Sequence, residues 1–98
     1  MPFFVKTELI KKEFINDSKL KKKFIDKHIL WIKDLKKAGI NIKSGFLVNE
    51  IKEPGAGGLL ILEVKTYKDA LNILIDDPMI KNKIVDWKLS EWVDISKE

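Results

Sequence analysis

The stretch DSKLKKKFIDKHILWIKDLKKA, residues Asp17–Ala38, predicts a long amphipathic helix around which the other elements can be placed. Asn16, Asp17 and Ser18 are residue types that commonly cap the start of a helix, and Gly39 can adopt the left-handed conformation just after its end. At about 100° per residue, the large apolar side chains share one arc of about 140°, which predicts that this side of the helix packs on a sheet. The side chains in that arc are Leu20, Phe24, Ile25, Trp31, Ile32 and Leu35.

Four further segments have the composition of β-strands. Residues Pro2–Ile10, Asn41–Glu50 and Ile84–Val93 alternate in polarity, and Leu59–Lys65 is apolar on both faces, as a central strand would be. The segment Lys52–Gly58 is rich in glycine and precedes the central strand, so it is predicted to be a hairpin turn.

The first strand contains two adjacent aromatic residues, Phe3 and Phe4, which must point to opposite faces of a sheet. Phe4 shares its face with Lys6 and Glu8. An aromatic side chain on that face indicates that the face is not fully exposed to water.

A second helix is predicted to begin after Thr66, a residue type that caps helix starts. Pro78 should end it, because the residue before a proline is pushed out of helical geometry, and Asp77 is therefore expected to be extended. Residues Met79–Lys83 are predicted to form a short turn, and Asp94–Glu98 a tail.

The order of these elements, β-α-β-β-α-β, predicts an α+β fold for a single domain of residues 1–98. The expected form is the ferredoxin-like plait, an antiparallel four-stranded sheet with two helices on one face. The other face carries too many large apolar side chains to face water. Two such sheets are therefore expected to meet face to face in a homodimer, which is a dimeric α+β barrel.

Composition excludes several kinds of chemistry. The chain has no cysteine and one histidine, which rules out disulfides, cysteine nucleophiles, zinc fingers and sites made of several histidines of one chain. The net charge is +4, but all 19 basic residues are lysine. Because nucleic-acid readers favour the planar fork of arginine, a solvated lysine face is favoured over a nucleic-acid site. No apolar run could span a membrane, and the N-terminus lacks the layout of a signal peptide, so a cytoplasmic protein without membrane contact is expected.

His28 is the candidate proton carrier, since histidine is the side chain best suited to transfer protons at neutral pH. It falls near the middle of the apolar arc of the long helix. Asp77 is held by the proline step and could meet it, because both predicted helices lie on the same face of the sheet. The alternative is a histidine that is buried in the apolar stripe and bonded to a backbone carbonyl, and spacing alone leaves both interpretations open.

Other features of the sequence carry weaker signals. The run Gly55–Gly58 does not fit a phosphate loop, because it precedes a strand rather than a helix, although its glycines could let backbone amides approach a ligand. Glu63 lies in an apolar strand and is a ligand contact, an acid or base at the dimer core, or a residue that reaches solvent. One histidine with scattered carboxylates gives no metal-ligand spacing, so no metal site is expected.

Several motifs occur in an order that is similar to one protein family. They are His28–Gly39, Ser44-Gly45, Pro54–Val64, Tyr67–Ala70 and Asp76–Met79. This succession resembles the YciI-like (YCII-related) family of dimeric α+β barrel proteins over nearly the whole chain. The resemblance implies a ferredoxin-like protomer, a homodimer and a His–Asp active-site pair that falls on His28 and Asp77. Two features depart from the family pattern: Phe46 stands where relatives often have proline, and arginines that relatives often carry are missing.

These inferences together predict a cofactor-free enzyme. His28 would act as general acid or base, and Asp77 would orient it. The substrate would be a small organic acid or a lactone-type compound, because some relatives implied by the resemblance act on chlorinated muconolactone-type compounds. Since the family's role is mostly unassigned, the alternative is a non-catalytic homodimer that binds a small molecule or has a regulatory role. The candidate substrate-binding residues are Ser44, Gly45, Gly57, Gly58 and Trp31.

Overall fold

The computed structural model describes residues 1–96; residues 97 and 98, the end of the predicted tail, lie outside the described residues. The order of strands and longer helices is the one that the sequence predicts. The elements are β1 (Phe3–Ile10), a short 3₁₀ turn η1 (Lys12–Phe14), α1 (Ser18–Lys37), β2 (Asn41–Val48), β3 (Pro54–Glu63), α2 (Tyr67–Leu74), α3 (Pro78–Lys81) and β4 (Val85–Trp92).

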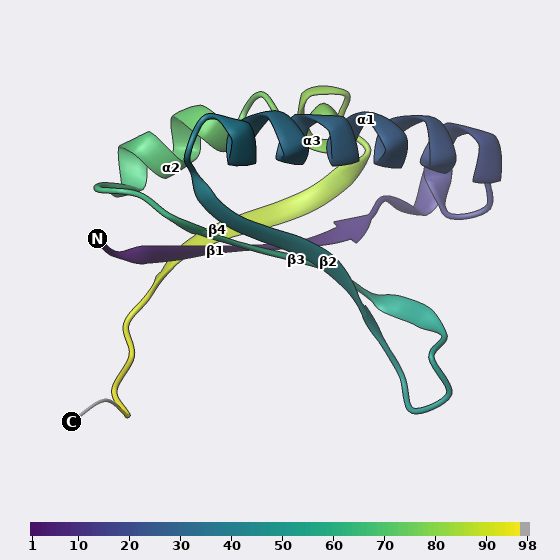
Figure 1. The fold of residues 1–98 in the computed structure, drawn as a ribbon. Coiled ribbons are helices and arrows are strands. Elements are labelled where there is room, and N and C mark those ends of the chain that lie inside the picture. Colours follow the sequence, from purple (N-terminus) through teal and green to yellow (C-terminus); the bar gives the residue numbers. More distant parts are fainter. Residues whose placement is uncertain (97–98) are drawn as a thin grey trace.

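The strands form one antiparallel sheet in the order β2-β3-β1-β4, which makes β2 and β4 the edge strands. Figure 1 shows α1, α2 and α3 together on one face of this sheet, whereas the opposite face bears no helix of the described residues. This arrangement confirms the predicted α+β plait. Among the described residues, no helix is long and apolar enough to cross a lipid bilayer.

The core lies between the helices and the inward face of the sheet. Phe4 of β1 and Leu60 and Leu62 of β3 are at most 1% exposed, because these two strands are central and are covered by helices. They form one cluster with Ile32 of α1 and Leu74 of α2. Burial of each large apolar side chain contributes roughly 1.5–3 kcal/mol, so this cluster fixes both helices on the sheet.

The hairpin between β2 and β3 does not turn where the sequence predicts. β3 already begins at Pro54, so the glycines of Gly55–Gly58 lie within a strand rather than in the turn. The turn is instead organised by Asn49, whose side-chain oxygen accepts hydrogen bonds from the backbone N–H groups of Ile51 and Glu53. An Asn side chain can close a loop in this way, and the glycine-rich run is then free to extend.

The segment that follows α2 also differs from the prediction. α2 ends at Leu74, and residues Pro78–Lys81 form the short helix α3 where a turn is expected. Pro78 therefore begins a helix, because a proline lacks only the N–H that the first helical position leaves unbonded. Asp77 is extended, with φ −58° and ψ 124°, as predicted.

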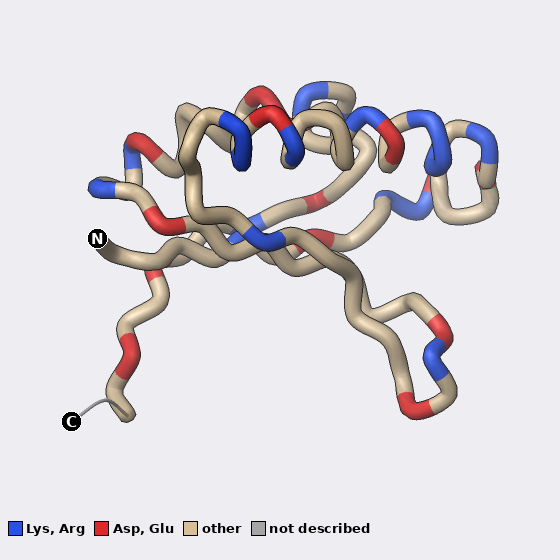
Figure 2. The backbone as a smooth tube through the Cα atoms, viewed as in Figure 1, with Lys and Arg blue, Asp and Glu red and all other residues tan. Residues whose placement is uncertain are grey.

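Lysines are spread along the length of α1 (Figure 2). Lys22 and Asp26 are both exposed and form an ion pair of 3.0 Å one turn apart. Exposed pairs of this kind contribute little stability, and the mixture of signs on α1 fits a solvated helix face.

Gly57 provides a test of the close packing between β1 and β3. Its φ is +92°, and a Cβ added there would overlap the carbonyl oxygen of Glu8. We expect Gly57→Ala to lower the free energy of unfolding by about 1–3 kcal/mol, because both the backbone conformation and the contact become strained. Gly45→Ala is the matched control, since a Cβ there has open space, and it should change stability by less than about 0.5 kcal/mol. Urea unfolding of both variants measures the difference, and equal losses would contradict this view of the strand contact.

Candidate active site

His28 points from α1 toward the sheet. The residues one turn before and after it, Phe24 and Ile32, are buried, so His28 lies on the packed side of the helix. Its side chain is 14% exposed, and its ring nitrogen Nδ1 lies 2.9 Å from Oδ1 of Asp77. The structure thus brings together the two residues that the sequence singles out, from positions 49 apart in the chain.

Asp77 reaches this position because it caps α3. Its Oδ1 accepts a hydrogen bond of 3.0 Å from the backbone N–H of Met79, and Pro78 fixes the backbone between them. The side chain of Asp77 is fully buried. The proline step therefore holds the carboxylate in place, as the sequence suggests, and also places it at a helix start, where negative charge is favoured.

A buried lysine, Lys6, completes the surroundings of Asp77. Its side chain is 1% exposed, and its Nζ donates to Oδ2 of Asp77 at 2.9 Å and forms a second ion pair with Oε1 of Glu8. Sequence reasoning did not assign a role to Lys6 or Glu8, because isolated charges in a strand usually face water. The signal was nevertheless present, since Phe4, Lys6 and Glu8 alternate onto one face and Phe4 is a core residue.

The carboxyl group of Asp77 remains ionised in this environment. Burial alone would raise its pKa, but the hydrogen bond from His28 and the positive charge of Lys6 outweigh that effect and lower the pKa below its usual value of 3.8. An ionised carboxylate can only accept hydrogen bonds, so Nδ1 of His28 must carry a proton and donate it. In the neutral ring, Nε2 is then left as the acceptor.

Nε2 of His28 lies 2.7 Å from Oγ of Ser44, an exposed residue of β2. In the neutral ring, the Ser44 hydroxyl donates this hydrogen bond and Nε2 accepts it. The ring of Trp31 flanks the imidazole, with centroids 5.5 Å apart and planes tilted by 42°. Ser44, His28, Asp77 and Trp31 therefore form one group, in which both nitrogens and one side of the imidazole are in contact with neighbouring residues.

The three candidate glycines have different surroundings from this group. Gly45 follows Ser44 in β2 and has open space where a side chain would be. Gly57 is pressed against the backbone of Glu8. Gly58 lies next to the side chain of Glu8, and a Cβ added to Gly58 would lie 2.9 Å from Cγ of Glu8. Gly57 and Gly58 thus serve the packing of Glu8 in this structure, and their predicted contact with a substrate stays a prediction.

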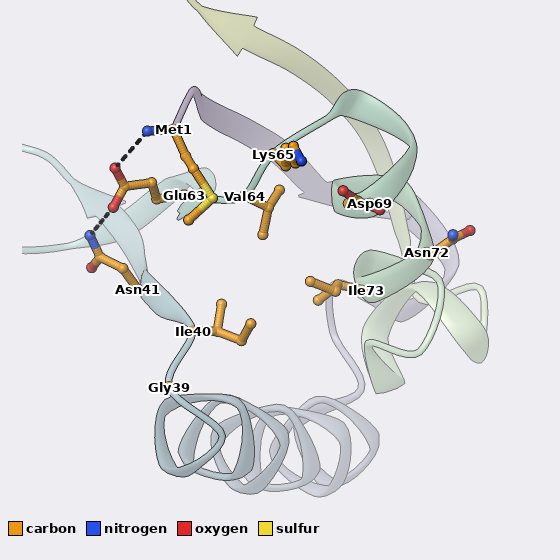
Figure 3. A pocket seen from close by; sticks show the side chains of 10 residues that line it. All are labelled: Met1, Gly39, Ile40, Asn41, Glu63, Val64, Lys65, Asp69, Asn72 and Ile73. Carbon is orange, nitrogen blue, oxygen red and sulfur yellow. Dashed lines mark hydrogen bonds and ion pairs between the residues drawn. The ribbon is translucent and has the colours of Figure 1, made fainter.

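Two open hollows on the surface of the described residues are not lined by His28. One of about 520 Å³ lies beside Gly39 and the start of β2, roughly 16 Å along α1 from His28 (Figure 3). There Glu63 accepts a hydrogen bond of 3.1 Å from the Asn41 side chain and is 26% exposed. The other hollow, of about 440 Å³, is bordered by Glu8 and Gly58. Within residues 1–96, no group of three or more carboxylates and histidines is arranged to hold a metal ion.

Comparison with known proteins identifies a structure of the same fold. No protein family and no curated protein matches the sequence. A similar solved structure is that of 5-chloro-2-hydroxyhydroquinone dehydrochlorinase from Burkholderia phenoliruptrix in complex with 2,5-dihydroxybenzoquinone. The TM-score is 0.73, the alignment covers 93% of each chain, and the sequences are 14% identical. At that identity the likeness shows a shared fold.

The ionised carboxylate of Asp77 should make stability depend on acid pH. Because the pKa is lowered in the folded protein, the stabilisation is complete above the unfolded value of 3.8 and is lost as pH falls through the folded value. We expect Asp77→Asn to cost about 3–5 kcal/mol at neutral pH, since it removes the fully buried one of the two carboxylates that pair with the buried Lys6.

The test is denaturant unfolding of the wild type and Asp77→Asn between neutral and strongly acid pH. The difference in unfolding free energy should shrink as pH falls below 3.8. Asp76→Asn, which replaces the exposed neighbouring carboxylate, is the control and should behave as the wild type. A difference that stays constant across this range would contradict an ionised Asp77.

Proposed function

We propose that this chain is a cofactor-free enzyme in which His28 acts as general acid and base and Asp77 orients it. The observation that carries the proposal is the pairing of Nδ1 with a fully buried carboxylate, while Nε2 is directed to an exposed residue, Ser44. A ring held in this way always presents the same nitrogen to a substrate. We also propose that the chain is a YciI-like member of the dimeric α+β barrel superfamily.

Asp77 orients the ring and does not take the proton itself. Its two oxygens already accept from Met79, His28 and Lys6, and its lowered pKa keeps it ionised. When Nε2 takes a proton from a substrate, the adjacent carboxylate stabilises the imidazolium that forms. His28 can then return that proton to a leaving group or to another atom of the product.

The substrate class that we propose is a small organic acid or a lactone-type compound. One solved structure of the same fold is that of a dehydrochlorinase in complex with a small dihydroxyquinone. Removal of hydrogen chloride from a chlorinated compound requires a base, which is the role that Nε2 of His28 can fill. The aromatic ring of Trp31 beside His28 would favour a flat, cyclic compound.

We further propose that the protein is a homodimer. The sheet face without helices carries large apolar side chains that in one protomer are exposed or half-buried, and they point away from the core by strand alternation. They are Phe3, Val5, Leu9, Leu59, Ile61 and Trp92. Two such sheets packed face to face would remove this surface from water.

His28→Gln tests the proposed chemistry. Turnover of 5-chloro-2-hydroxyhydroquinone and of a muconolactone can be followed by absorbance, with Lys33→Gln on the exposed side of α1 as control. For whichever of these compounds the wild type converts, we expect kcat/KM to fall by a factor of about 10²–10⁴ in His28→Gln and to stay unchanged in the control.

Turnover that survives His28→Gln would contradict the acid–base role. If neither compound turns over but one binds saturably, with the same Kd in wild type and His28→Gln, the non-catalytic binding alternative would be favoured instead.

Leu9→Glu tests the dimer. Leu9 is 57% exposed on the helix-free face, and Ile75, at the end of α2 on the helix side, is 50% exposed and gives a matched control. We expect wild type and Ile75→Glu to sediment as dimers and Leu9→Glu to shift to monomers, because a buried unpaired charge opposes association. A monomeric wild type at micromolar concentration would contradict the proposal.

A further inference from the structure

We propose that Ser44 is a nucleophile and that the site catalyses acyl transfer to water, so that the protein hydrolyses activated esters or lactones through an acyl-serine. The inference rests on the proposed function, since it needs His28 as the base. It is carried by the geometry of one hydrogen-bonded chain. Oγ of Ser44 is 2.7 Å from Nε2 of His28, and Nδ1 of the same ring is 2.9 Å from Oδ1 of the buried Asp77.

This order of groups is the one that activates a serine. A hydroxyl is a weak nucleophile unless a base within hydrogen-bond distance removes its proton, and the base must itself be oriented by a third group. Here the three roles fall on Ser44, His28 and Asp77, and the exposed Ser44 lies on the edge strand β2. An acyl compound can therefore approach Oγ from the side of the sheet that no neighbouring strand occupies.

The Ser44 hydroxyl is not needed to position the imidazole. The carboxylate of Asp77 is fixed by Met79 and Lys6 and already sets the ring through Nδ1. In addition, the hydroxyl occupies the nitrogen that must receive a substrate proton. The proton that His28 meets first is therefore that of Ser44, which favours a role for this residue in the chemistry itself.

The reaction balances with water as the second substrate. Oγ of Ser44 forms a bond to the carbonyl carbon while its proton passes to Nε2 of His28. The tetrahedral intermediate breaks its bond to the leaving oxygen, which takes the proton from Nε2. Water then attacks the acyl-serine and gives a proton to Nε2, and that proton returns to Oγ as the acyl–oxygen bond breaks. The sum is ester plus water to carboxylic acid plus alcohol.

The charges of the site point to substrates with good leaving groups. Lys6 is the cation that contacts the hydrogen-bonded residues Ser44, His28 and Asp77, through Asp77. Its side chain is 1% exposed and is paired with both Asp77 and Glu8. Among the described residues, no ammonium group is bonded to Ser44 or to Nε2 of His28. Without a free cation beside the reacting oxygen, compounds whose leaving oxygen readily carries negative charge should react best. Aryl esters and enol lactones are of that class.

Two probes test the proposal on the whole 98-residue chain. A fluorophosphonate should label Ser44, located by peptide mass spectrometry, and 4-nitrophenyl acetate should give a rapid release of nitrophenolate with an acetyl group on the same residue. We expect Ser44→Ala to abolish both signals and His28→Gln to reduce both at least tenfold. Ser90→Ala, at an exposed position of the other edge strand, is the matched control and should leave both unchanged.

Ser44→Cys guards against a loss caused by misfolding. A thiol at this position should still be acetylated, and the modification should still depend on His28. Labelling that avoids position 44, or an acetyl group found on His28 instead, would overturn the proposal. If Ser44→Ala keeps a turnover that His28→Gln abolishes, Ser44 is not the nucleophile and the acid–base function stands. If His28→Gln changes no activity, the proposed function fails as well.

Discussion

The structure depends on the burial of one carboxylate. Asp77 has no solvent contact, so its charge must be satisfied entirely by protein groups. Three donors do this: the backbone N–H of Met79, Nδ1 of His28 and Nζ of Lys6. These donors come from α3, α1 and β1, so this carboxylate connects two of the helices to a central strand. Loss of any donor would leave part of a buried charge uncompensated, which is costly in a small domain.

The same constraint defines the site. A carboxylate bonded on both oxygens cannot rotate, so the ring of His28 cannot turn over and Nε2 must face β2. In the strand register, the fully buried Leu60 lies between Ser44 and Lys6, the two residues at the ends of this hydrogen-bonded group. The imidazole is thus held by Asp77 at Nδ1 and flanked by Trp31, and its Nε2 reaches the exposed Ser44. The stability of the fold and the geometry of the site therefore rest on the same contacts.

Sequence patterns predict the fold and two members of the charged group, His28 and Asp77, but not Lys6 and Glu8. Alternation and capping signals specify strands and helices locally, and the Asp77-Pro78 step marks a rigid carboxylate that could meet His28 on the common face of the sheet. The sequence does not predict the role of Lys6, because a lysine in a strand normally faces water and one of its two partners, Asp77, lies 71 positions away. The hairpin was misplaced for a related reason, since the side chain of Asn49 closes the turn before the glycines are reached.

Glu8 supplies the second carboxylate of the charged group that Lys6, Asp77 and His28 form. Its side chain lies across Gly58, the position on β3 where a Cβ would crowd it, and from there it pairs with Lys6. Lys6, Asp77 and Glu8 together carry one net negative charge when the imidazole is neutral. A proton taken up at Nε2 brings that sum to zero. Uptake of a proton by His28 therefore removes net charge from this poorly solvated region rather than adding it, because the compensating groups are already in place.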